Sequence, residues 1–118
     1  MALSLNKEIL AGAYDYLCTT PPFRNWNLPE GEDVVFKITR DPKIAGFYQK
    51  EKKTGRHIIG VSGVCIGRTA TLMELMAHEM THLHQACAGM ASGSQHNAAF
   101  RKLAQSICKV HGFDPRMF

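Results

Sequence analysis

The sequence predicts an α+β domain, and three patterns along the chain support this fold class. Apolar residues recur at helical spacing near both ends and in a central segment, which predicts three helices. Between the first two of these segments lie short β-branched runs bounded by turn residues, which predict a small sheet. The chain has 118 residues, of which 45% are hydrophobic and 20% charged. We therefore expect one domain, spanning residues 1–118.

The first predicted element is an amphipathic helix over residues 3–18. Its apolar residues recur every three or four positions, and Ser4 or Asn6 can serve as its N-cap. The loop that follows contains three prolines, which cannot continue a helix. We expect Phe23 and Trp26 to anchor this loop on the core.

Three strands are predicted next, over residues 34–39, 46–50 and 56–66. The first alternates apolar and polar residues, and the other two are apolar, β-branched runs. The charged, Gly-containing segment 51–55 between them has the form of a hairpin turn. We therefore expect a small antiparallel sheet of about three strands.

Two further helices are predicted after the sheet. Residues 69–88 contain no Gly or Pro and are dominated by helix-forming residues. Residues 89–95, with two glycines and two serines, break this helix. Helical periodicity resumes over residues 97–111 and ends before Gly112, which predicts a C-terminal helix.

The longer helix contains His78-Glu79-Met80-Thr81-His82, which has the form HExxH. Residues four apart on a helix are rotated by about 40°, so both imidazoles can reach one metal ion. Glu79 lies beside them, where it can act on a metal-bound water. An apolar stripe on the same side predicts that this site lies at the edge of the core. The alternative interpretation is two surface histidines and a solvated glutamate on a core helix.

A catalytic zinc ion usually takes three protein ligands, so a third ligand is required. The metzincin pattern places the third ligand six residues after the second His, but this position is Ala88. The gluzincin pattern takes a Glu from a later helix, but no glutamate follows Glu79. His96 opens the last helix after a flexible loop, and a helix hairpin can fold it back over the motif. We therefore expect His78, His82 and His96 to bind zinc.

The other three histidines have ordinary interpretations. His84 is rotated by about 200° from His82 around the helix and so lies on another face. His57 lies on a predicted strand, and His111 lies at a helix end, where a cation is favoured.

The four cysteines are widely spaced and form no CxxC pair. We interpret them as reduced core residues, with a disulfide or metal role as the alternative. This usage, and Lys7 and Glu8 where a signal peptide would be apolar, predict a cytoplasmic protein. The apolar stretches are too short to cross a bilayer, so we expect no membrane partner. The cysteines are Cys18, Cys65, Cys87 and Cys108.

Over about residues 46–113 the sequence resembles the SprT-like metallopeptidases, the family that includes the Spartan proteases. The resemblance rests on a basic hairpin (GFYQKEKKTGRHIIGVS), an apolar lead-in (TLMELMAHEMTHLHQ), and a late His with a Phe four residues on (HNAAF). It implies a zincin-like minimal fold, zinc ligands at His78, His82 and His96, and a catalytic Glu79. The sequence departs from the family in lacking a Gly beside the third His and a Cys-rich zinc ribbon, which predicts a minimal catalytic domain.

These observations predict a zinc-dependent metallopeptidase that acts on protein or peptide substrates. Zinc lowers the pKa of a bound water to about 7, and Glu79 would take its proton and pass it to the leaving nitrogen. Tyr48, His57 and Arg68 are all candidates for stabilising the oxyanion. A hydrolase of a non-protein amide or a cell-wall peptide is an alternative.

Basic residues are concentrated between residues 41 and 68. Six Lys or Arg against two Asp or Glu give this segment a charge of +4. Lys50, Lys52, Lys53 and Arg56 can contact nucleic-acid phosphates non-specifically, although such a run is also typical of a solvated turn. Spartan-type proteases act on proteins attached to DNA, so the resemblance extends the expectation to DNA-associated substrates. The alternative function is a non-catalytic, zinc-containing module that binds nucleic acid or protein.

Overall fold

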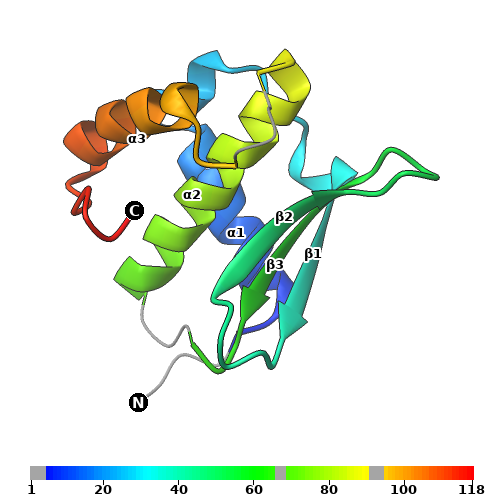
Figure 1. The fold of residues 1–118 in the computed structure, drawn as a ribbon. Coiled ribbons are helices and arrows are strands. Elements are labelled where there is room, and N and C mark those ends of the chain that lie inside the picture. Colours follow the sequence, from blue (N-terminus) through cyan, green and yellow to red (C-terminus); the bar gives the residue numbers. More distant parts are fainter. Residues whose placement is uncertain (1–4, 66–68, 91–94) are drawn as a thin grey trace.

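The computed structural model describes residues 5–65, 69–90 and 95–118 (Figure 1). Within these residues it contains three α-helices and one three-stranded sheet, which confirms the α+β class. No helix in the described part of the chain is long and apolar enough to cross a membrane. The elements are α1 (Lys7–Cys18), β1 (Val34–Thr39), β2 (Gly46–Lys50), β3 (His57–Ser62), α2 (Thr69–Ala88) and α3 (Ala98–His111).

The sheet has the strand order β1-β3-β2 and is mixed. β2 runs antiparallel to β3, with Tyr48 opposite Ile59, but β1 runs parallel to β3, with Phe36 opposite Ile59. The prediction of an antiparallel sheet is therefore wrong for β1. β3 is buried over nearly its whole length, which favours the central position, whereas β2 is exposed at its end and suits an edge. Because β2 occupies one side of β3, β1 pairs with the other.

The N-terminal helix α1 begins after Asn6, whose side chain accepts a hydrogen bond from the Ile9 N–H at 2.8 Å. Asn6 is thus the N-cap, and Ser4 lies outside the described residues. The loop after α1 is anchored as predicted, because Phe23 is buried and Trp26 packs edge-on against it. The residues of α1 that face the core are Leu10, Ala13, Tyr14 and Leu17.

Helix α2 is the central element of the fold. It packs against α1, α3 and the sheet, and the sheet and α3 lie on different sides of it (Figure 1). A Cβ atom at Gly46 would lie 2.9 Å from the Leu75 side chain and from the Gly60 carbonyl oxygen. Glycine therefore allows β2 to approach α2 closely. The fully buried residues of α2 include Met76, Ala77, Met80 and Leu83.

All four cysteines are free. Cys108 is buried and Cys18 is half-buried, but Cys65 and Cys87 are exposed. The prediction of core positions is wrong for these two because Cys65 lies in the turn after β3 and Cys87 lies in the last turn of α2.

Candidate metal centre

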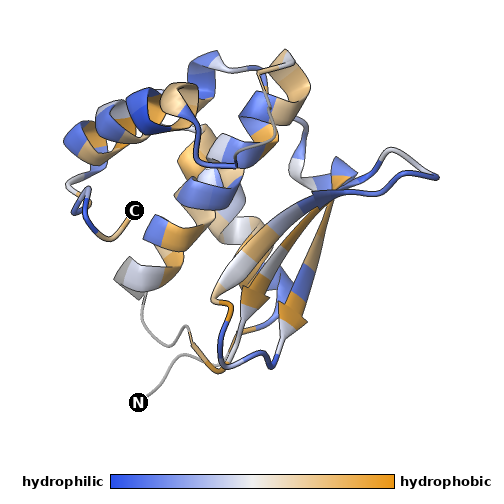
Figure 2. Ribbon diagram, in the orientation of Figure 1, coloured by the Kyte–Doolittle hydropathy of each residue, from blue (hydrophilic) through white to orange (hydrophobic). Residues whose placement is uncertain are grey.

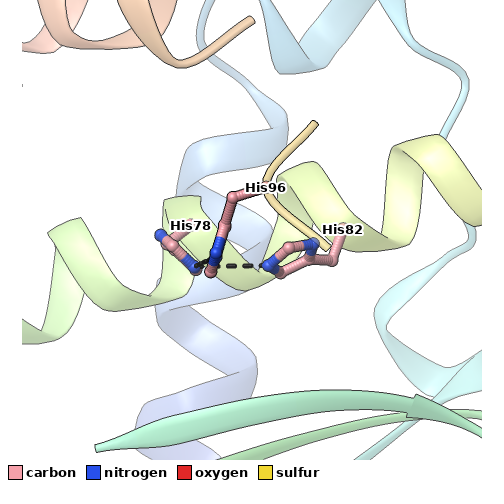
Figure 3. A group of neighbouring side chains, drawn as sticks. All are labelled: His78, His82 and His96. Carbon is pink, nitrogen blue, oxygen red and sulfur yellow. Dashed lines mark hydrogen bonds between the residues drawn. The ribbon is translucent and has the colours of Figure 1, made fainter. Parts of the chain in front are cut away.

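Three imidazoles converge beside α2 (Figure 3). His78 and His82 lie one turn apart on α2, and His96 lies two residues before α3. Nε2 of His78 is 3.3 Å from Nε2 of His82 and 3.2 Å from Nε2 of His96. In a tetrahedral zinc site with Zn–N bonds of about 2.0–2.1 Å, ligand nitrogens stand about 3.3 Å apart. The three predicted ligands are therefore close enough to bind one metal ion.

The ring of His78 is also engaged through its second nitrogen. Nδ1 of His78 lies 2.6 Å from the main-chain oxygen of Phe118. Since this oxygen can only accept, the ring nitrogen donates, which leaves a lone pair on Nε2 in the neutral imidazole. That lone pair faces the nitrogens of His82 and His96.

Polar contacts between α2 and the start of α3 place His96. The buried Gln85 donates to Asn97 Oδ1 at 3.1 Å, and this oxygen also accepts from the Phe100 N–H at 2.9 Å as the N-cap of α3. Asn97 Nδ2 donates to the carbonyl oxygen of Met90 at 3.3 Å. Sequence reasoning did not assign Gln85 and Asn97 this role. Two features of the sequence could have indicated this role. Gln85 is a polar residue three positions after the HExxH motif, and Asn97 stands at the start of the predicted C-terminal helix.

The aromatic ring of Phe100 packs against the imidazole rings of all three histidines. Its ring centroid lies 4.6–4.9 Å from the centroids of all three imidazole rings. The ring is 3% exposed, so it keeps water away from one side of the histidines. An apolar surrounding strengthens the electrostatic attraction between imidazole nitrogens and a cation.

Glu79 is buried next to the histidines and lines the same groove. Its side chain is only 3% exposed, and burial raises its pKa from 4.5 to about 7. Burial also lowers the pKa of His78 and lowers that of His82 to about 4, with the neighbouring imidazoles adding to the effect on His82. Both of these rings are therefore neutral at pH 7, which is the form that binds metals.

A groove of about 670 Å³ lies over the imidazoles, a volume typical of ligand sites. Gly46 and Tyr48 line it from β2, and Met117 and Phe118 line it from the C-terminal turn. The main-chain N–H of Ser62 donates a hydrogen bond to the carbonyl oxygen of Ala45, just before β2. Because hydrogen-bonded pairs alternate along an antiparallel ladder, the odd-numbered residues of β2 direct their main-chain N–H and C=O groups to β3. The N–H and C=O groups of Gly46 and Tyr48 therefore point away from β3, at the free edge.

Of the three candidates for oxyanion stabilisation, Tyr48 lines the groove. Its hydroxyl lies 2.7 Å from Nδ1 of His57, and Nε2 of His57 lies 3.9 Å from Sγ of Cys87. Burial raises the pKa of Tyr48 to about 12, so the phenol stays protonated at neutral pH. His57 contacts the Tyr48 hydroxyl, and Arg68 lies outside the described residues.

The two remaining histidines lie apart from the cluster. His84 stacks on Trp26, with ring centroids 4.0 Å apart and an angle of 13°. Nε2 of His111 lies 2.9 Å from the carbonyl oxygen of Pro21. Among the described residues, the one group of three or more potential metal ligands is that of His78, His82 and His96.

The predicted basic residues are exposed on the hairpin that joins β2 and β3. This hairpin projects from the sheet on the side away from α2, and hydrophilic residues dominate it (Figure 2). The four positive charges therefore lie on one hairpin, and none of these residues lines the groove over the histidines. The residues are Lys50, Lys52, Lys53 and Arg56.

No family model matches the chain, and no curated protein gives a significant match. The resemblance to SprT-like metallopeptidases therefore rests on the sequence motifs themselves.

Proposed function

We propose that the protein is a zinc-dependent metallopeptidase of the SprT-like type. The observation that carries this proposal is the convergence of three Nε2 atoms, two of them 3.2 and 3.3 Å from the third, beside the buried Glu79. Three protein ligands leave a fourth position open, as in catalytic zinc sites, whereas structural sites are usually closed by four ligands. Bound zinc supplies Lewis acidity, which polarises a carbonyl and makes water nucleophilic near neutral pH.

Glu79 carries the proton in this proposal. Because its pKa lies near 7, a large fraction of the carboxylate is ionised at neutral pH and can accept a proton from the attacking water. The protonated carboxyl can then donate that proton to the nitrogen that leaves the scissile peptide bond. A carboxylate with an ordinary pKa of 4.5 would be a weaker base toward the attacking water.

The edge of β2 supports an extended polypeptide as the substrate. The main-chain groups of Gly46 and Tyr48 face away from β3, and both residues line the groove. An extended peptide can add to such an edge through main-chain hydrogen bonds, independently of its side chains. This arrangement favours a protein or peptide over a small non-protein amide.

The exposed basic hairpin supports the finer proposal that the substrates are proteins associated with DNA. Its four cations can make non-specific phosphate contacts while the groove holds a polypeptide. The same hairpin favours the alternative function, a non-catalytic zinc-containing module that binds nucleic acid or protein. We place either activity in the cytoplasm, because four free cysteines, two of them exposed, fit a reducing compartment.

The test is cleavage of fluorescently labelled casein by the wild type, Glu79→Gln and Glu74→Gln, with and without single-stranded DNA. Glu74 also lines the groove, on the same helix, and serves as the matched control. We expect chelator-sensitive cleavage that zinc restores, a loss of about 10²–10⁴-fold in Glu79→Gln with zinc retained, and activity in Glu74→Gln. Full activity in Glu79→Gln would contradict the assignment. Zinc and DNA binding without cleavage would favour the non-catalytic module.

A further inference from the structure

We propose that the main-chain oxygen of Phe118 is a positioning group of the metal centre. By accepting the Nδ1 proton of His78, it fixes the tautomer and the orientation of this ring, so that Nε2 is presented to the metal. This inference rests on the proposed metal centre and adds to it a part of the chain that lies 40 residues away from His78.

The geometry of the contact is that of a strong hydrogen bond. The nitrogen and oxygen are 2.6 Å apart, and His78 is half-buried. A neutral imidazole in water can carry its proton on either nitrogen, but an acceptor held at Nδ1 selects the tautomer with a free Nε2. Histidines that bind metals commonly donate their other N–H to a carbonyl or carboxylate oxygen in this way.

A turn after α3 holds this oxygen in place. The N–H groups of Met117 and Phe118 both donate to the carbonyl oxygen of Asp114, at 3.0 and 3.2 Å. The guanidinium of Arg116 donates to both carboxylate oxygens of Asp114, at 3.2 and 3.0 Å. These contacts close the turn locally and direct residue 118 back toward α2.

The side chain of Phe118 anchors the turn to the metal centre. Its ring centroid lies 5.2 Å from that of His78, 6.1 Å from that of Phe100 and 6.2 Å from that of Phe113. Phe100 in turn packs under all three imidazoles. The ring therefore connects the turn, and with it the oxygen, to the same aromatic cluster that contacts the three imidazoles.

The test is zinc affinity, measured by competition with a chromophoric chelator at pH 7.5, for four forms of the 118-residue chain. Truncation after Arg116 removes both the oxygen and the ring, whereas Phe118→Ala removes the ring and keeps the oxygen. Lys109→Ala is the control, because this residue is exposed on α3 and does not line the groove. We expect truncation to weaken zinc binding by about 10- to 100-fold, Phe118→Ala to weaken it less, and Lys109→Ala to leave it unchanged.

Each outcome bears on a different part of the proposal. Wild-type affinity in the truncated chain would overturn the role of Phe118 and leave the metal centre intact. An equal loss in Phe118→Ala and in the truncated chain would assign the effect to the ring instead of the oxygen. A wild type that binds no zinc would overturn the metal centre and, with it, this inference.

A second measurement does not depend on the truncated chain folding. Long-range ¹H–¹⁵N correlation spectra of the zinc-loaded wild type report which nitrogen of each imidazole is protonated and which binds metal. We expect His78 to carry its proton on Nδ1 and to bind zinc through Nε2. Zinc on Nδ1 of His78, or a deprotonated Nδ1, would overturn the proposal.

Discussion

Replacing Glu79 with glutamine should raise the free energy of unfolding of the metal-free protein. Burial raises the pKa of Glu79 from 4.5 to about 7. Each pH unit of this difference corresponds to about 1.36 kcal/mol, so above pH 7 the buried carboxylate costs the fold about 3 kcal/mol. A glutamine of nearly the same shape carries no charge and avoids most of that cost, although its buried amide retains a smaller one.

The sign of the pH dependence follows from the same pKa. The folded carboxyl holds its proton more tightly than the unfolded one, so the native state binds more protons between pH 4.5 and 7. This carboxyl therefore lowers the unfolding free energy as the pH rises through that interval, and its contribution is constant above it. The lowered pKa values of His78 and His82 act in the opposite sense, but they are common to both proteins and largely cancel in the comparison.

The assay is urea unfolding followed by circular dichroism, in chelator, at pH 5 and pH 8. We expect Glu79→Gln to exceed the wild type by about 3 kcal/mol at pH 8 and by much less at pH 5. Glu32→Gln, at an exposed position, should change little at either pH. A variant no more stable than the wild type at pH 8, or equally stabilised at both pH values, would refute the reasoning.

Three further predictions concern residues outside the histidine cluster. Gly46→Ala should destabilise the fold by about 1–3 kcal/mol in urea unfolding, because the new Cβ meets the Leu75 side chain at 2.9 Å. Asn97→Ala should lose about 1 kcal/mol by the same assay and weaken zinc binding, because it removes the α3 cap beside His96. Replacing the hairpin cations with glutamine should abolish salt-sensitive retention on a DNA column; these are Lys50, Lys52, Lys53 and Arg56.

The candidate metal centre can be predicted from the sequence as far as local periodicity determines it. The spacing of His78 and His82 places both rings on one face of a helix wherever that helix packs. His96 could be predicted as the third ligand because the metzincin and gluzincin positions hold no suitable residue. The loop before it also allows the chain to fold back over the HExxH motif. In the structure, Nε2 of His96 lies 3.2 Å from Nε2 of His78, which is close enough for both to bind one metal ion.

The features that sequence reasoning missed depend on contacts between distant segments. A strand has the same alternation whether its partner is parallel or antiparallel, so the direction of β1 relative to β3 cannot be read from its residues. The contact between His78 and Phe118 joins positions 40 residues apart, and no local pattern marks it. Cys87 has apolar neighbours in the sequence but is exposed, because it lies in the last turn of α2.

The central claim is that three histidines bind one zinc ion, and metal content per chain tests it most directly. Untagged wild type, His96→Ala and His84→Ala would be compared by plasma mass spectrometry after incubation with zinc and removal of the excess. His84 is the matched control because it lies on α2 but stacks on Trp26, outside the cluster. We predict about one zinc per chain in the wild type and in His84→Ala, with marked loss in His96→Ala. A folded wild type without zinc, or full occupancy in His96→Ala, would contradict the claim.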